Sequence, residues 1–190
     1  RGLGEKIKSS FVDLIRYLIK GGYVILLIPI LFGERLEEQD VGLLEGIYSL
    51  FKKEKETKKK IFFLPSNVDA YAQQLIISKL FCVISVRYHG IVFSVKGRVP
   101  FISISYEDKI KGFIEKIGFT DLMINVEEIS ADNIIDKFTY LEENYDIIRE
   151  RLRDRGSSLK EESRETTRIV LEKLRCLGLI VLKPREPGER

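Results

Sequence analysis

The chain has 190 residues, 44% of them hydrophobic, and a net charge of +3 from 32 basic and 29 acidic side chains. That length is enough to bury one sizeable core, which favours a single compact domain with room for an appendage. The two signs of charge are too evenly mixed to create the basic field that nonspecific nucleic-acid binding requires, so no DNA or RNA partner is expected.

The longest apolar run, 23–32, includes Pro29 and is far shorter than the roughly 20 residues that a membrane-spanning helix needs. We therefore interpret it as a buried strand and expect no membrane span. No secretory signal opens the chain, and two cysteines, Cys82 and Cys176, give no disulfide framework, so a cytoplasmic setting is expected. The missing initiator methionine suggests a fragment of a longer protein.

Apolar runs and helical periodicity alternate from the start of the chain to residue 126. The runs are nearly continuous, which is typical of strands covered on both faces, and they lie at 23–28, 61–64, 82–86, 101–105 and 122–126. Helical spacing of apolar residues marks 5–20, 40–50, 69–80, 88–96 and 108–116. This alternation predicts an α/β fold with a doubly wound, Rossmann-like parallel sheet.

Two of these helices carry more specific predictions. Asp40 stands where the N-cap of the second helix is expected, since its side chain can accept from a free backbone N–H. In the helix 69–80, Tyr71, Leu75, Ile76 and Leu80 have the spacing of an inward face and are expected to be buried.

From Asp132 onwards the pattern is helical only. Apolar residues spaced by three and four predict a long helix, which Gly156-Ser157-Ser158 is expected to interrupt before another helix that ends near Cys176. We divide the chain into a Rossmann-like domain, helices that pack on that domain, and a disordered tail: 1–130, 131–182 and 183–190.

The segment 85–118 is the most informative part of the sequence, because it places the only histidine, His89, two residues after Arg87 at a strand-to-helix turn. The segment is predicted to be a strand, a helix and a strand, a unit that crosses over right-handedly and pairs its strands in parallel. Arg87 and His89 then follow one strand, and 106–111 follows the next. Ligands of open α/β sheets collect at this edge.

Several familiar sites are absent from the sequence. No G-x-G-x-x-G follows a strand, no P-loop motif occurs and no Cys/His cluster has zinc spacing, so neither a cofactor nor a metal is expected. One histidine and no G-x-S-x-G argue against a Ser-His-Asp hydrolase.

A cationic, hydrogen-bonding pocket remains as the candidate site. Arginine can grip a carboxylate or phosphate through two parallel N–H donors, and histidine is the side chain that changes charge near neutral pH, which suits Arg87 and His89 to an anionic ligand. Lys109 and Lys111 add positive charge on the next loop, and two helix N-termini add backbone N–H groups.

Each of these residues also has a purely structural interpretation. His89 can be a satisfied structural residue, and Arg87 can form a domain-stabilising ion pair with the acidic residue at 107 or 108. The two lysines can be solvated helix residues, and Tyr106 can simply close the end of its strand. The residues alone leave both interpretations open.

One predicted β-α-β unit carries motifs at characteristic spacing: Ser85-x-Arg87-Tyr88-His89, Gly97-x-x-Pro100, Ile104-Ser105-Tyr106, Lys109 and Gly112-Phe113. In these motifs the chain resembles the polysaccharide pyruvyl transferase family, and looser similarity extends over most of its length. Family members look like two-domain, GT-B-like transferases that move a pyruvyl group from phosphoenolpyruvate onto two hydroxyls of a sugar as a cyclic ketal. The resemblance implies that this chain is the C-terminal, donor-binding half, whose partners are phosphoenolpyruvate, a glycan acceptor and the N-terminal domain of the same protein.

The resemblance also implies roles for individual residues. His89 would be the catalytic acid, and Arg87 would grip the phosphate or carboxylate of the donor. Further substrate-binding residues would be Arg1, Ser105, Tyr106, Lys109 and Lys111. The family often has Leu before the histidine, whereas this chain has Tyr88, which leaves the shape of the pocket open. The scheme requires no metal and no cofactor besides the donor substrate.

Two other functions stay open on the residues. The first is a nucleotide-sugar glycosyltransferase of the GT-B type, which would use the same sheet edge for a diphosphate. The second is a non-catalytic α/β module that binds a protein through its C-terminal helices. If the acceptor-binding half is absent from this chain, these residues alone should show little or no activity.

Overall fold

The computed structural model describes residues 2–30 and 40–177. Arg1 and the predicted tail 183–190 therefore lie outside the described residues. Contacts between Cα atoms divide the chain into two compact units, residues 1–152 and 153–190. The sheets and the candidate site belong to the first unit.

Helices and strands alternate as the sequence predicts. The strands are β1 (Ile25–Leu27), β2 (Ile61–Phe63), β3 (Val83–Ser85), β4 (Phe101–Ser105) and β5 (Met123–Asn125). The helices are α1 (Leu3–Lys20), α2 (Asp40–Lys52), α3 (Ala70–Ile77), α4 (Tyr88–Gly97), α5 (Asp108–Ile117), α6 (Ala131–Glu143) and α7 (Tyr145–Cys176). Two short 3₁₀ helices, η2 (Thr120–Leu122) and η3 (Val126–Glu128), flank β5.

All strand pairs are parallel, which confirms the α/β fold class. The strands form one sheet in the order β1-β2 and a second in the order β3-β4-β5. Ile25 pairs with Ile61 in the first sheet, and Val83 pairs with Phe101 in the second. Within the described residues, no hydrogen-bonded ladder joins β1 to β3, so the predicted single sheet is divided between these two strands.

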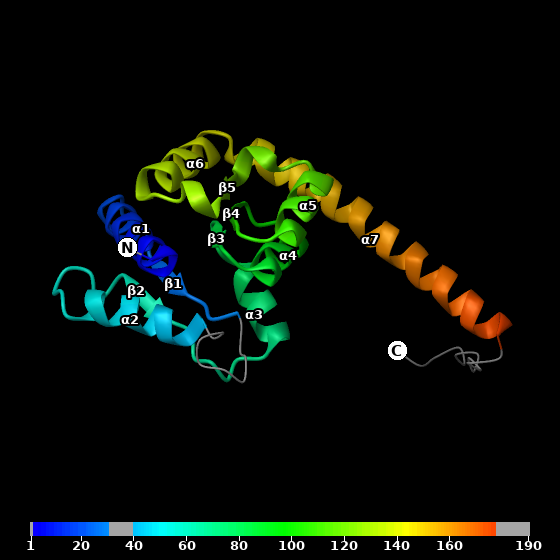
Figure 1. Cartoon of the computed structure of the whole chain (residues 1–190), viewed down its shortest axis with the longest axis horizontal. Coiled ribbons are helices and arrows are strands. Elements are labelled where there is room, and N and C mark those ends of the chain that lie inside the picture. Colours follow the sequence, from blue (N-terminus) through cyan, green and yellow to red (C-terminus); the bar gives the residue numbers. More distant parts are fainter. Residues whose placement is uncertain (1, 31–39, 178–190) are drawn as a thin grey trace. The chain divides into compact units, whose positions relative to one another are not determined.

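Helices cover both faces of the strands, as the continuous apolar runs indicate. In Figure 1, α3, α4 and α5 lie along one side of β3 and β4, whereas α1 and α6 lie together on the other side. All five residues of β4 are buried, which places this strand at the centre of the core. A second group of buried residues joins α1 and α2 to β1 and β2 through Ile15, Ile47, Phe51 and Ile61.

Helix α3 turns a different face to the core from the one its sequence predicts. Tyr71 and Leu75 are 79% and 56% exposed, whereas Gln73 is only 2% exposed. The amide Nε2 of Gln73 donates to the carbonyls of Pro29 and Val68 at 3.1 and 3.2 Å. These two bonds satisfy the buried amide, so the helix packs its polar residue inward and leaves the aromatic one in solvent.

The C-terminal helices are also divided at a different point from the predicted one. The break lies at Asn144, between α6 and α7, and α7 continues through Gly156-Ser157-Ser158. Ser157 Oγ donates to the carbonyl of Arg153 at 2.9 Å, four residues back, as a hydroxyl inside a helix can. One glycine costs a helix only about 1 kcal/mol, which the long α7 tolerates.

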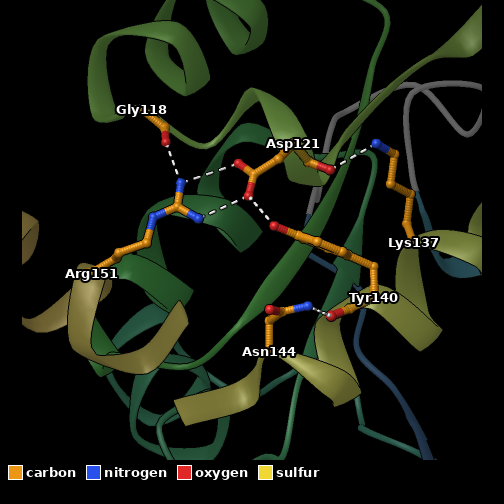
Figure 2. Close-up of polar contacts among 6 residues, drawn as sticks. All are labelled: Gly118, Asp121, Lys137, Tyr140, Asn144 and Arg151. Carbon is orange, nitrogen blue, oxygen red and sulfur yellow. Dashed lines mark hydrogen bonds and ion pairs between the residues drawn. The ribbon is translucent and has the colours of Figure 1, made fainter. Parts of the chain in front are cut away.

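Arg151, near the start of α7, binds the amino-terminal end of β5 (Figure 2). Its Nη1 and Nη2 donate to the two carboxylate oxygens of Asp121 at 2.8 and 3.2 Å, and Nη2 also donates to the carbonyl of Gly118 at 2.6 Å. Tyr140 and Lys137 of α6 donate to the carboxylate and the carbonyl of Asp121. Burial opposes the charge of Asp121, but Arg151 outweighs it and lowers the pKa of the carboxyl. These contacts fasten α6 and the start of α7 to the sheet.

Among the described residues, no helix is both long and apolar enough to cross a membrane.

Candidate functional site

The turn between β3 and α4 has a compact geometry that its sequence explains. Ser85 Oγ accepts from the backbone N–H of Arg87 at 3.0 Å, which closes the turn directly after the strand. A Cβ atom on Gly90 would lie 2.4 Å from Ser85 Oγ, so α4 can approach the strand this closely only with glycine there. Ser85 and Gly90 together therefore determine the position of the Arg87 backbone.

The Arg87 guanidinium lies at the carboxyl end of β3 and joins two other elements. Its Nε and Nη2 both lie 2.8 Å from Oδ1 of Asp40, the first residue of α2 and 47 positions away in the chain. Its Nη1 donates to the hydroxyl of Tyr106, just after β4, at 2.9 Å. The second carboxylate oxygen of Asp40 accepts from the backbone N–H of Ile30 at 3.2 Å. We call Asp40, Arg87 and Tyr106 the carboxyl-edge triad.

The triad is only partly shielded from solvent. The side chain of Asp40 is 11% exposed and that of Arg87 is 26% exposed. Burial disfavours the charged guanidinium, but the bond to Asp40 and its charge outweigh burial and raise the pKa of Arg87. Burial and a bond to Glu107 also raise the pKa of Tyr106, against the lowering effect of Arg87. Arg87 is therefore cationic and Tyr106 is a neutral phenol at neutral pH.

Arg87 does form an ion pair, as its structural interpretation suggests, but its partner is Asp40 rather than Glu107 or Asp108. The sequence predicts Asp40 only as a helix cap, whereas its carboxylate bonds to the backbone N–H of Ile30 and to Arg87. A signal for the pair does exist: Asp40 begins the helix that follows β1, so it belongs to the same carboxyl edge as Arg87.

His89 lies in the first turn of α4, and its side chain is exposed. Its ring packs near those of Tyr88 and Phe93, with centroids 5.8 and 6.3 Å apart. Tyr88 is also covered by Lys109, whose Nζ lies 4.4 Å from the ring centroid. The imidazole therefore borders an aromatic and cationic surface made by α4 and α5.

The remaining predicted residues occupy different environments. Ser105 is buried, and its hydroxyl donates to the carbonyl of Glu107 at 3.3 Å. Lys111 is exposed on α5. Of the predicted residues, Arg87 and Tyr106 are therefore in direct contact. Lys109 lies over the ring of Tyr88, the neighbour of His89 in the chain, and Arg1 lies outside the described residues.

A cavity of about 180 Å³ inside the domain reaches Asp40 and Arg87 of the triad. Asp40, Ser85, Arg87 and Gly90 line its polar end, and apolar residues line the rest. Within 2–30 and 40–177, no group of three or more His, Cys, Asp or Glu side chains could hold a metal ion. At this polar end the Asp40 carboxylate pairs with the Arg87 guanidinium, and the Ser85 hydroxyl donates to the carbonyl of Arg87 at 3.1 Å, so the N–H groups that Arg87 has left are the groups that could bind an anion.

Comparison with protein families gives a match over the first part of the chain. A family model described as polysaccharide pyruvyl transferase matches residues 1–108 of the 190-residue chain. The matched part runs from α1 to the first residue of α5 and includes the triad and His89. Neither the curated proteins nor the solved structures yield a match.

Proposed function

This chain belongs to the polysaccharide pyruvyl transferase family, and we propose that it is the donor-binding half of an enzyme that transfers a pyruvyl group from phosphoenolpyruvate to a sugar. The family match carries the proposal. The triad supports it, because the Arg87 guanidinium keeps N–H donors at the sheet edge where ligands of α/β proteins bind. The acceptor would be a glycan that offers two hydroxyls.

The proposed reaction forms a cyclic ketal. The donor's methylene carbon takes up a proton and becomes a methyl group, and the neighbouring carbon forms bonds to two sugar oxygens. The bond from that carbon to the phosphate oxygen breaks, and inorganic phosphate leaves. The two sugar hydroxyls together release two protons: one replaces the proton that the methylene carbon takes up, and the other leaves with phosphate. The reaction therefore needs no oxidant and no cofactor. The scheme requires a proton donor and a cation for the phosphate.

Arg87 is the proposed anchor for the donor's phosphate or carboxylate. Asp40 holds the Nε and Nη2 edge of the guanidinium at 2.8 Å, which orients the group before any ligand binds. Each terminal nitrogen carries two hydrogens, so further N–H groups remain for an anion even with these bonds formed. A preoriented cation of this kind loses little freedom on binding.

His89 is the proposed acid that protonates the methylene carbon. Its exposure on the first turn of α4 leaves the imidazole accessible to a ligand at the sheet edge. We assign donor contacts to Tyr106 and Lys109, and weaker electrostatic roles to Lys111 and Arg1. Ser105, which is buried, would act by positioning the loop after β4.

Ligand-dependent melting of the 190-residue chain tests this proposal. Phosphoenolpyruvate should raise the melting temperature more than inorganic phosphate does at equal concentration, because it adds a carboxylate contact. Arg87→Ala should remove most of that rise. Arg151→Ala is the matched control, since it removes an arginine paired with an aspartate at the opposite edge of the sheet and should keep the rise.

The same experiment separates the alternatives. Stabilisation by a nucleoside diphosphate sugar, with none by phosphoenolpyruvate, would favour a glycosyltransferase. Absence of stabilisation by any of the three ligands would favour a non-catalytic module. An equal response in Arg87→Ala and the parent chain would remove Arg87 from the donor site.

A further inference from the structure

Four adjacent rings form a continuous series on α4 and α5. The ring of Tyr88 lies 5.3 Å from that of Phe113 and 5.8 Å from that of His89, measured between centroids. The series ends at Phe93, whose ring centroid lies 6.3 Å from that of His89. His89 is exposed and the other three residues are only partly buried. Neighbouring rings that solvent reaches are more informative than one exposed ring, because such patches mark binding sites. We call these four rings the aromatic series.

The surface beside His89 is where the acceptor sugar has to lie. This requirement follows from the proposed function, in which His89 protonates the donor's methylene carbon. The two sugar oxygens bond to the carbon directly attached to that methylene group, so they must come close to the imidazole. The side chains nearest the imidazole in the series are the rings of Tyr88 and Phe93. A sugar positioned for the reaction would therefore rest on them.

We propose that the aromatic series binds a pyranose ring of the acceptor glycan. One face of a pyranose presents mainly C–H groups, whose hydrogens carry partial positive charge and fit the negative face of an aromatic ring. The hydroxyls around the sugar stay free for the reaction and for hydrogen bonds. An apolar aromatic surface with a few polar groups is the usual composition of a small-molecule site.

Lys109 occupies the face of Tyr88 that the sugar would cover. Its Nζ lies 4.4 Å from the centroid of the Tyr88 ring, and the lysine is exposed. An exposed contact between an ammonium and a ring is weak, whereas the bond of an ammonium to a phosphate is strong. A bound donor would therefore draw Lys109 to its phosphate and open the ring to the sugar. Donor binding would precede acceptor binding for this reason.

A protein partner fits the aromatic series less well than a sugar does. The centres of protein interfaces are depleted of charged residues, and lysine is one of the depleted types. Here the ammonium of Lys109 lies against a ring of the series. A protein that covered the series would remove the hydration of this ammonium, which is costly. A sugar offers hydroxyl oxygens to the ammonium and leaves room for water.

Saturation-transfer NMR on the 190-residue chain tests the proposal, with the methyl β-glycosides of glucose, galactose and mannose as probes. At least one glycoside should receive saturation, whereas glycerol, a polyol without a ring face, should receive none. Titration then gives the Kd. Tyr88→Leu and Phe93→Leu should each raise the Kd about 3- to 10-fold, because each removes one ring and keeps an apolar side chain. Tyr88→Phe keeps the ring and should bind like the parent chain.

Tyr48→Leu is the matched control. The ring of Tyr48 also lies near a phenylalanine and a lysine, with its centroid 5.8 Å from that of Phe63 and 5.2 Å from Nζ of Lys52. Tyr48 belongs to α2, which contributes no ring to the aromatic series, so its change should leave the Kd unaltered. Lys109→Ala should lower the Kd about two- to fivefold without donor, because it uncovers the ring of Tyr88.

Four results would overturn the proposal. They are no saturation of any glycoside, equal saturation of glycerol, an equal Kd in the parent chain and both leucine variants, and a raised Kd in Lys109→Ala. A dimer in sedimentation that Tyr88→Leu dissociates would also overturn it, since a second copy would then cover the rings.

Amide chemical shifts of the parent chain give a measurement that does not depend on how the variants fold. Addition of a glycoside should shift the signals of 88–93 and 109–113 and leave those of 48–63 in place, and the reverse pattern would overturn the proposal. Stabilisation by phosphoenolpyruvate together with ring-independent glycoside binding would refute this inference alone. Ring-dependent glycoside binding without stabilisation by phosphoenolpyruvate would instead refute the donor site.

Discussion

Arg87 and Arg151 each hold an aspartate from a distant part of the chain, but they do so at opposite edges of one sheet. Arg87 follows β3 and binds Asp40 at the carboxyl edge. Arg151 binds Asp121, which precedes β5, at the amino edge (Figure 2). The residue pair is the same, so differences between the two regions reflect their surroundings.

The Arg151 side chain is 36% exposed and that of Arg87 is 26% exposed, so exposure does not distinguish the two sites, whereas their partners do. Arg151 bonds to both carboxylate oxygens of Asp121 and to a carbonyl, and its Cζ lies 4.4 Å from the centroid of the Phe119 ring. At the carboxyl edge, Arg87 bonds to one oxygen of Asp40 and to the hydroxyl of Tyr106, a side chain that is 42% exposed. The first arrangement fastens α6 and the start of α7 to the sheet, and the second places an arginine at the edge where ligands of α/β sheets bind. The comparison teaches that position relative to the strand ends separates a structural arginine from a candidate ligand-binding one.

Removal of the imidazole at the carboxyl edge is expected to have the largest effect. His89→Ala should lower pyruvyl transfer at least a hundredfold in the full-length enzyme, because a general acid contributes about 10²- to 10⁴-fold. The melting temperature should stay the same, since the side chain is exposed. Steady-state turnover and thermal melting measure the two quantities. Turnover like that of the parent enzyme would exclude His89 as the acid, and Lys137→Ala at the amino edge is the control that should leave transfer intact.

The two arginines should respond differently to the same conservative change. Arg87→Lys loses the planar fork and should raise the KM for phosphoenolpyruvate about 10- to 100-fold, in line with 1.5–3 kcal/mol for a hydrogen bond to a charged group. Arg151→Lys should leave that KM unchanged and lower the melting temperature instead. Donor titrations of both variants measure this contrast. Equal KM values for the two variants would contradict the assignment of Arg87 to the donor.

Local patterns sufficed to predict the strands, the helices as far as α5, and the sheet edge at which Arg87 and Tyr106 lie. Each strand is a continuous apolar run, and the parallel pairing follows from the helices between them. The hydrogen bond from Arg87 to Tyr106 agrees with the expectation that both lie at one sheet edge.

Contacts that depend on three-dimensional packing could not be predicted in the same way. The sequence places Asp40 at the same carboxyl edge as Arg87, but it does not favour Asp40, 47 residues away, over the acidic residues at 107 and 108, which follow β4 at that edge. Gln73 is buried because two carbonyls from other segments meet its amide, and helical periodicity carries no information about them. The division between β1 and β3 likewise concerns which strands are neighbours, whereas apolar runs predict only that strands exist.

Adding a methyl group at Gly90, beside the turn that carries Arg87, should destabilise the fold, whereas adding one at Gly112 on the open side of α5 should not. Gly90→Ala should lower the free energy of unfolding by about 1–3 kcal/mol, because the new Cβ would meet Ser85 Oγ at 2.4 Å and force the strand or the helix to move. Gly112→Ala in α5 is the matched control. No atom lies within 4 Å of its added Cβ, so the change should stabilise the helix by about 0.5–1 kcal/mol. Denaturant unfolding of both variants measures the difference, and two changes of the same sign would contradict this account of the turn.

The smallest expected effect belongs to the amino edge and depends on pH. Arg151→Met should lower the free energy of unfolding by about 1–2 kcal/mol at pH 7, because it removes a partly exposed charged hydrogen-bond cluster. Arg151 lowers the pKa of Asp121 in the folded chain, so the unfolded chain takes up a proton first as the pH falls. The stabilisation is therefore complete above the unfolded pKa of about 3.9 and is lost as the pH falls through the lower folded value. The free energy of unfolding of the parent and of the variant is measured by denaturant between pH 7 and pH 2.5, and the two values should converge below about pH 4. A difference in unfolding free energy that stays constant across this range would mean that Arg151 acts through packing on Phe119 rather than through the charge of Asp121.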